Sequence, residues 1–250
     1  MKVRDIIDAL DLPSETGINR RVPKKLLVEN GAPTAADKRQ INEGIEELLW
    51  LAALKPTTIG VPEYRDDIRE YLEIAVLSVV LRSPAKTRRL VELIHRAIPY
   101  PLLLVAAQSD NLTLSLAHKR WSQGDAGKMV LDDAVTLCDL VEHAATEAFL
   151  NSLSLVVQPR SHLLDLYQGW INCLEAFQSA QITGRLAPSS SSETAAARRE
   201  ALAEYDHLVR QIANLRAQAE REPQINRRVD LNLEIKRLET ELAESIKRME

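Results

Sequence analysis

Apolar residues near the C-terminal end recur at intervals of four and three, the spacing that keeps one stripe of a helix against a partner helix. Pro223 interrupts the pattern and excludes a single continuous helix, so we expect two helices that meet at a kink or a hairpin. Pairing could occur within one chain or between two chains. The residues expected to form this seam, and to support oligomerisation if it joins two chains, are Tyr205, Leu208, Ile212, Leu215, Leu231, Ile235, Leu238 and Leu242.

Changes in composition divide the rest of the chain. Residues 1–140 mix apolar runs with Pro-containing turns, and residues 141–186 have a helical pattern throughout. Residues 187–193 include Ala187, Pro188 and a run of serines, which cannot bury apolar surface and therefore predict a flexible linker. The coiled-coil helices are then expected over residues 194–250.

The first part predicts an α+β domain with a mostly antiparallel sheet of four or five strands and flanking helices. Strands are expected over residues 45–54, 71–81, 102–106, 112–116 and 129–137, and the run 71–81 is apolar on both faces, as in a central strand. Residues 45–54 could instead continue the preceding helix, but Trp50 and the stop at Lys55-Pro56 favour a strand. Helices are expected over residues 3–12, 24–30 and 87–98, and Thr34 with Asp37 predicts a further helix start.

The cysteine content favours a cytoplasmic protein, and the charge balance restricts its partners. The 32 basic and 36 acidic residues give a net charge of −4, so no global basic field exists to hold nucleic acid. The two cysteines are too few for a disulfide scaffold. Arg4, Asp5 and Asp8 interrupt the first turns, where a signal peptide would be apolar, and the longest apolar run is too short to span a membrane.

The chain carries no recognisable catalytic motif. Its five histidines are too far apart for adjacent metal ligands, and neither a phosphate-binding Gly-rich loop nor a Gly-x-Ser-x-Gly elbow is present. We therefore assign no catalytic residue, metal or cofactor. The alternative is a metal-dependent nuclease of restriction-enzyme type that uses Glu70 or Glu73, although no lysine lies between Lys55 and Lys86.

One segment is locally basic. Between Arg82 and Arg120, seven basic residues are opposed only by Glu92 and Asp110. Such a cluster could contact phosphates, or it could be a solvated helix face or bind an acidic protein partner. The residues predicted to face DNA or a partner protein are Arg88, Arg89, Arg96, His118, Lys119 and Arg120. A second basic set could extend this surface: Arg20, Arg21, Lys24 and Lys25.

Several short segments carry a resemblance to a bacterial family. They are Val22-Pro23-Lys24-Lys25, Ala35-Ala36-Asp37-Lys38, Trp50-Leu51 with Leu54-Lys55-Pro56, Arg96-Ala97-Ile98-Pro99-Tyr100-Pro101, Ser115-Leu116-Ala117-His118-Lys119-Arg120, and residues 224–232 with Ile235-Lys236. Together they resemble the uncharacterised family catalogued as domain of unknown function 4391. The resemblance implies a gene neighbourhood, because such proteins are often encoded beside helicases and DNA methyltransferases in restriction or antiphage defence clusters. It implies no catalytic residues, and where many relatives end a more polar strand in lysine, this chain has Arg82.

These observations lead to one main expectation and two alternatives. The main expectation is a non-enzymatic accessory or scaffold subunit of a DNA-targeting defence complex, which docks a helicase or methyltransferase and could itself contact DNA. The alternatives are a degenerate or active metal-dependent nuclease and a free-standing DNA-binding protein. Homo-oligomerisation through the C-terminal helices is a further possibility, and no membrane partner is expected.

Overall fold

The computed structural model describes residues 1–125, 127–188 and 191–249. The chain divides into two compact units, Met1–Leu174 and Glu175–Glu250, which we describe separately. Residues 189–190 of the predicted linker, and residue 250 of the predicted helical segment, lie outside the described residues.

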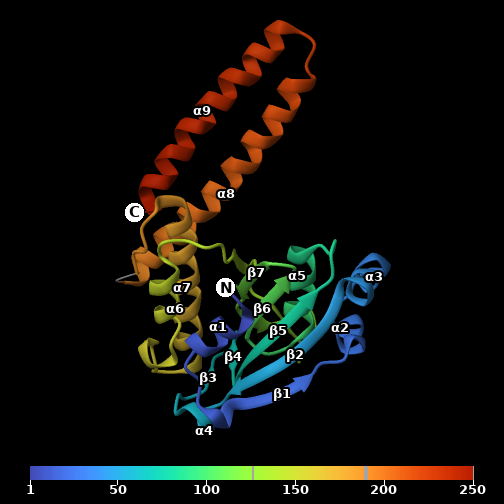
Figure 1. Ribbon diagram of the computed structural model, residues 1–250, viewed down its shortest axis with the longest axis vertical. Helices are drawn as coiled ribbons and strands as arrows, with labels where there is room; N and C mark the ends of the chain where they lie inside the picture. The colour runs from blue at the N-terminus through green and yellow to red at the C-terminus, as the bar shows by residue number, and fades with distance from the viewer. Residues whose placement is uncertain (126, 189–190, 250) are drawn as a thin grey trace. The chain divides into compact units, whose positions relative to one another are not determined.

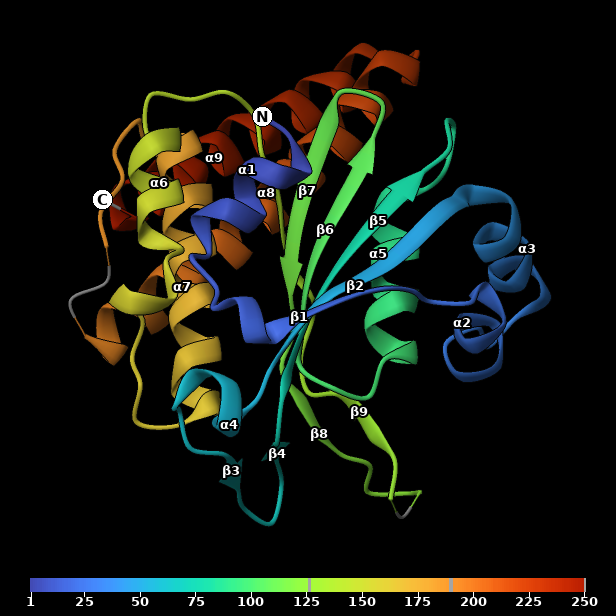
Figure 2. The same cartoon turned by 60° about the horizontal axis from the view of Figure 1, so that its bottom comes forward.

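The first unit is built on a six-stranded sheet in the order β1-β2-β5-β6-β7-β10 (Figure 2). Its strands are β1 (Gly17–Arg21), β2 (Ile45–Leu54), β5 (Ile74–Leu81), β6 (Leu102–Gln108), β7 (Asn111–Leu116) and β10 (Thr136–Asp139). Only β5 and β6 pair in parallel, and every other neighbouring pair is antiparallel. The α+β class is therefore confirmed, with a sheet that is larger than the predicted four or five strands.

The additional strand, β1, lies at the edge of the sheet and is mostly exposed, so it lacks the apolar alternation that marks a half-buried strand. The single strand predicted over 129–137 is wrong. That segment forms β9 (Met129–Leu131), which pairs with β8 (Lys119–Trp121) in a separate hairpin, and then β10 in the main sheet. The polar pair Asp132-Asp133 lies between the two strands.

The predicted strand over 71–81 also starts later than expected. Glu70–Tyr71 form β4, which pairs with β3 (Tyr64–Arg65) in a small hairpin outside the main sheet. The central strand β5 begins only at Ile74, and Glu73 lies in the short connection between the two strands.

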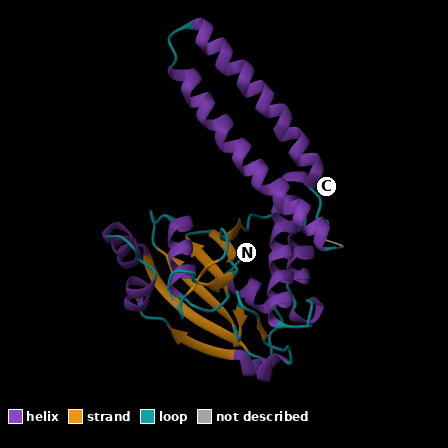
Figure 3. Cartoon of the chain, turned by 180° about the vertical axis from the view of Figure 1, so that it is seen from behind, coloured by secondary structure: helices purple, strands orange, loops and turns teal. Residues whose placement is uncertain are grey.

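Helices cover both faces of the sheet (Figures 2 and 3). One face packs against α2 (Lys24–Asn30), α3 (Ala35–Gly44) and α5 (Thr87–Ala97), with alternate residues Ala75, Leu77, Val79 and Leu81 of β5 in this core. Thr34 caps α3 as predicted, because its Oγ1 accepts the backbone N–H of Asp37 at 3.1 Å.

The opposite face of the sheet packs against α1 (Val3–Ala9), α6 (Thr146–Ser152) and the first part of α7 (Leu163–Thr183) (Figure 2). Short helical turns lie at η1 (Ser14–Thr16), α4 (Pro56–Ile59) and η2 (Leu155–Val157). The expectation of a continuous helical pattern over 141–186 is therefore wrong. Residues 141–145 are not helical, and Pro159 lies between η2 and α7, where a helix interior would not tolerate it.

The second unit contains the end of α7 together with two long helices, α8 (Ser192–Arg221) and α9 (Ile225–Met249) (Figure 1). Ser191 caps α8 by accepting the N–H of Thr194 at 3.3 Å, so this helix starts slightly earlier than predicted. The two helices run antiparallel as a hairpin within one chain, because Ser245 Oγ donates to Ala201 O near one end and Arg216 pairs with Glu239 nearer the other. Across the described residues, no helix is both long and apolar enough to cross a membrane.

Candidate functional site

Helix α5 carries three of the predicted site residues, Arg88, Arg89 and Arg96. It follows β5 and leads into the parallel strand β6, so it crosses the sheet and buries an apolar side that includes Leu90 and Ile94. Amphipathic spacing leaves the three arginines on the polar side of the helix. Only Arg88 of the three makes no ion pair within the described part of the chain.

Arg89 is neutralised by two carboxylates. Its Nε and Nη2 donate to the two oxygens of Asp37, at 2.8 and 2.9 Å, and its Nη1 donates to Glu92 at 2.8 Å. The hydrogen bonds from Arg89, together with that from Thr34, lower the pKa of Asp37 to about 2. The bidentate pair of Arg89 and Asp37 links α5 to α3, so Arg89 has a structural role.

Arg96 is neutralised by the same glutamate. Its Nη2 lies 2.6 Å from Glu92 Oε1, so Glu92 bridges Arg89 and Arg96 along one side of α5. The charges of the two arginines and of Asp37 and Glu92 therefore cancel. This part of α5 contributes little positive potential at the protein surface.

Lys119 does not lie on a surface, contrary to the prediction. Its side chain is only 1% exposed, and Nζ donates to the carbonyl oxygens of Ile98, at 2.8 Å, and of His95. Both carbonyls are at the C-terminal end of α5, where a helix leaves acceptors unsatisfied and favours a cation. Burial lowers the pKa of the Lys119 ammonium to about 7.

His95 is the buried neighbour of Lys119. Its Nε2 lies 3.0 Å from Ser115 Oγ, while its Nδ1 is buried without a hydrogen-bond partner. Burial, and then the nearby charge of Lys119, keep the pKa of His95 well below its usual range. The imidazole is therefore neutral at physiological pH and belongs to the core.

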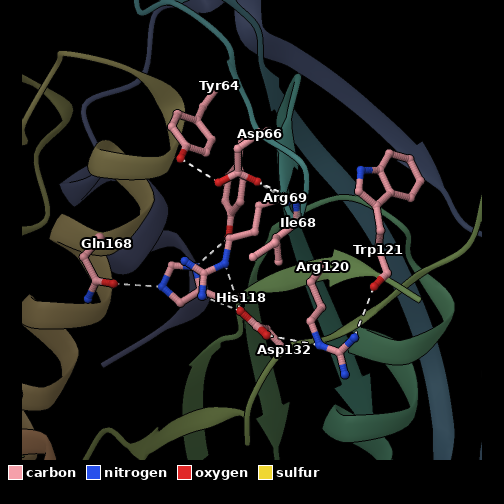
Figure 4. Close-up of polar contacts among 10 residues, drawn as sticks. Tyr64, Asp66, Ile68, Arg69, His118, Arg120, Trp121, Asp132 and Gln168 are labelled. Atoms are coloured by element: carbon pink, nitrogen blue, oxygen red, sulfur yellow. Dashed lines mark hydrogen bonds and ion pairs between the residues drawn. The ribbon is translucent and has the colours of Figure 1, made fainter. Parts of the chain in front are cut away.

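His118 lies between two hydrogen-bonding side chains, Tyr71 and Gln168 (Figure 4). Its Nδ1 is 2.5 Å from the hydroxyl of Tyr71, and its Nε2 is 2.8 Å from Gln168 Oε1. The rings of Tyr71 and Tyr167 both pack near the imidazole. This arrangement orients the ring, and it joins the sheet side of the unit to α7 rather than presenting His118 to a polyanion.

Arg120 shares a carboxylate with a second arginine (Figure 4). Arg120 Nε lies 3.2 Å from Asp132 Oδ1, and Arg69 Nε donates to Asp132 Oδ2 at 2.9 Å. Trp121 N also donates to Ile68 O at 2.8 Å, which ties the β8–β9 hairpin to the β3–β4 connection. The network holds two hairpins together through residues far apart in the sequence.

The six predicted residues therefore do not form one basic surface. Arg88 is exposed and makes no ion pair with any residue that the structure describes. Arg89, Arg96 and Arg120 are ion-paired, Lys119 is buried, and His118 is fixed between two polar side chains. Sequence reasoning missed Asp37, Arg69 and Asp132 as partners. Among the acidic partners, only Glu92 could have been predicted from the sequence. It lies three residues after Arg89 and four before Arg96, which is the spacing of ion pairs along a helix.

The predicted seam residues lie mostly inside the α8–α9 hairpin. Leu208, Ile212, Ile235 and Leu238 are buried against one another, and Leu215 and Leu242 pack against them. Tyr205 and Leu231 are half-buried. In this structure the seam is thus closed within one chain, which is one of the two pairings that the sequence left open.

The acids of the nuclease alternative occupy separate ion pairs. Glu70 lies 3.2 Å from Arg65 Nη1, and Glu73 lies 3.2 Å from Lys55 Nζ. In the part of the chain that the structure describes, no group of three or more His, Cys, Asp or Glu side chains is placed to hold a metal ion.

The fold and the internal charge pairs together define a mixed α+β sheet domain that carries an antiparallel helical hairpin. The profile of the family described as "Domain of unknown function (DUF4391)" matches residues 10–242, nearly the whole chain. The chain belongs to this family, as the sequence resemblance implied. No curated protein and no solved structure matches it.

Proposed function

We propose that the protein is a non-enzymatic accessory subunit of a cytoplasmic bacterial DNA-targeting complex, in which the α8–α9 hairpin docks a partner protein. The observation that supports this proposal is an apolar stripe on α9 that the hairpin itself leaves uncovered. Ile225, Val229 and Leu233 are 68%, 50% and 62% exposed.

The three residues follow one another at intervals of four and so lie on one face of α9. At 100° per residue, this face points away from the seam formed by Ile235 and Leu238. Pairing with α8 therefore leaves the stripe in solvent. An isolated exposed apolar residue is ordinary, but a stripe of this kind is typical of an interaction surface.

The spacing of the stripe indicates how a partner would bind. Apolar anchors at successive turns of one helix fit an apolar groove of another protein, in the mode that amphipathic helices commonly use. The partner class that we propose, a helicase or a DNA methyltransferase, comes from the gene neighbourhood expected for the family. Homo-oligomerisation through the seam is not part of this proposal, because α8 and α9 already satisfy it.

The test is an affinity purification of the tagged protein from its native host at chromosomal expression. We expect recovery of a helicase or DNA methyltransferase in near-equal amount to the tagged chain. The double substitution Val229→Glu with Leu233→Glu should abolish this recovery, because it places two charges in the apolar contact. Gln211→Glu with Asn214→Glu, two exposed positions on α8, adds the same charge away from the α9 stripe; it is the matched control and should retain the partner.

Recovery of the unmodified protein alone would overturn the proposal. Equal partner recovery with the stripe variant would place the docking surface elsewhere and refute the role of α9. Because the substituted side chains are exposed and lie away from the seam, circular dichroism should show unchanged helix content in all variants.

A further inference from the structure

A row of cations on the first unit combines the start of the predicted basic segment with two residues of the second basic set. We define it as the basic edge: Arg21, Lys24, Arg82, Lys86 and Arg88. Within the described residues, none of the five makes an ion pair, in contrast to Arg89, Arg96 and Arg120.

The sheet topology gathers these residues. Strands β1 and β5 are both antiparallel to β2 and therefore run in the same direction. Arg21 ends β1, Lys24 begins α2, and Arg82 follows β5 directly, so the three come together near the junction of α3 and β2. Lys86 and Arg88 continue the row through the connection from β5 into α5.

The cations are close enough to repel one another. Burial, and then the charges of Arg82 and Arg21, lower the pKa of Lys24, while Glu46 acts in the opposite sense more weakly. Clustering like charges that are not ion-paired destabilises a folded chain, and the nearby carboxylates of Glu43 and Glu46 form no ion pair with these cations within the described residues. An anionic ligand would remove this repulsion.

Two of the cations are held in position by hydrogen bonds to backbone carbonyls. Lys24 Nζ donates to Asn42 O, at 3.0 Å, and to Ile45 O, while Arg82 Nη1 donates to Glu43 O at 3.1 Å. These bonds use two of the three donors of the lysine and one of the five of the arginine. The remaining donors are available to a ligand, and the groups that carry them are already oriented.

Arg82 and Lys86 line a hollow of about 250 Å³. Its other borders include Gly44, Glu43 and Gln40, and the Oε1 of Gln40 is buried without a hydrogen-bond partner. Leu90, the one large apolar side chain among the lining residues, is buried. The first turn of α5 begins beside the hollow, and its N-cap residue, Lys86, makes no side-chain cap. The positive end of the helix dipole therefore adds to the positive potential of the hollow.

We propose that the basic edge binds the phosphate backbone of double-stranded DNA. The character of the surface favours this ligand over an acidic protein, because protein interfaces have an apolar core, whereas protein–DNA interfaces are polar and positively charged. The hollow also lacks an aromatic platform on which single-stranded bases could stack. This inference goes beyond docking through α9, and it rests on a different unit of the chain.

The test is a fluorescence anisotropy titration of the full-length protein with a labelled mixed-sequence DNA duplex over a range of salt concentrations. We expect affinity to fall steeply with salt. The double substitution Arg82→Glu with Lys86→Glu should weaken binding about tenfold or more, and should reduce the log–log salt slope by about 1.8, because each phosphate contact contributes about 0.9.

The matched control is Lys55→Glu with Arg65→Glu, which changes the net charge equally. Both control residues are exposed and lie in surface ion pairs. Lys55 follows the end of β2 opposite to Ile45, whose carbonyl accepts from Lys24 of the basic edge. Binding by this control should stay near that of the unmodified protein. An equal loss in both double variants would show that only net charge matters, and would overturn the assignment.

Two further measurements test the same surface. Arg88→Glu changes a side chain that makes no ion pair in the described chain, so it should weaken binding even if the double variant fails to fold. Binding to polyglutamate but not to the duplex would assign the edge to an acidic protein and refute DNA binding. The titration contains no partner protein, so a failure to bind DNA would not affect the docking proposal. Likewise, a failure to recover a partner protein would not affect the proposal that the basic edge binds DNA.

Discussion

The buried Lys119 predicts an unusual dependence of stability on pH. Its pKa is lowered by burial to about 7 in the folded protein, whereas the ordinary value is 10.5. Between these two values, the folded chain holds Lys119 neutral while the unfolded chain keeps it protonated. The unfolded state then binds more protons, so the free energy of unfolding should rise with pH.

The magnitude follows from this difference in proton binding. The slope approaches about 1.4 kcal/mol per pH unit between the two pKa values, which gives about 2 kcal/mol between roughly pH 7.5 and 9. Below pH 7 the full penalty for burying the charged ammonium is present, and raising the pH relieves it. Other groups titrate in the same range, including cysteines whose pKa is raised by burial, so a difference measurement is required.

The assay compares urea unfolding of the unmodified protein and of Lys119→Met at several pH values. Methionine fills a similar volume and does not titrate, so subtraction of the two profiles isolates the contribution of Lys119. We expect the difference in unfolding free energy to change by about 2 kcal/mol over this range. Parallel profiles would refute the reasoning, and would show that the carbonyls of His95 and Ile98 keep the ammonium charged in the folded state.

Three other predictions test the seam, the α3–α5 ion pair and the nuclease alternative. Ile235→Ala should lower the stability of the hairpin by about 2 kcal/mol and speed hydrogen exchange in α8 and α9, whereas Leu233→Ala, on the exposed face, should change exchange little. Because the pKa of Asp37 is depressed to about 2, its contribution to stability should be present above about pH 4 and be lost as the pH falls toward 2; Asp37→Asn should remove this dependence in acid unfolding. If the chain is a metal-dependent nuclease, divalent-dependent DNA cleavage should be detectable and Glu73→Ala should abolish it; we expect no cleavage from either protein.

Features that depend on local spacing could be predicted from the sequence. The cap of α3 by Thr34, the strand over 45–54 and the seam of α8 and α9 each follow from side chains within a few residues of one another. The edge strand β1 could not be predicted in this way, because exposure on most of its residues leaves no apolar alternation.

The placement of Lys119 shows why the candidate site was harder to predict. The residue comes just after a strand with clear alternation, where a lysine is normally exposed, and nothing nearby in the sequence signals its burial. Its burial depends on the carbonyls at the end of α5, more than twenty residues earlier. The pairing of Arg69 with Asp132 joins residues 63 positions apart, so it also has no local signal.

Ion pairs within the chain also decide which cations remain able to attract an anionic ligand. Of the seven basic residues between Arg82 and Arg120, four are neutralised or buried by the fold: Arg89, Arg96, Lys119 and Arg120. The three that remain are Arg82, Lys86 and Arg88, and all of them lie in or beside the connection from β5 into α5. A count of charge along the sequence therefore overestimates the basic surface and spreads it across two regions. The fold concentrates the unpaired charge at one end of the sheet, where Arg21 and Lys24 join it, so the search for an anionic ligand belongs there rather than at residues 118–120.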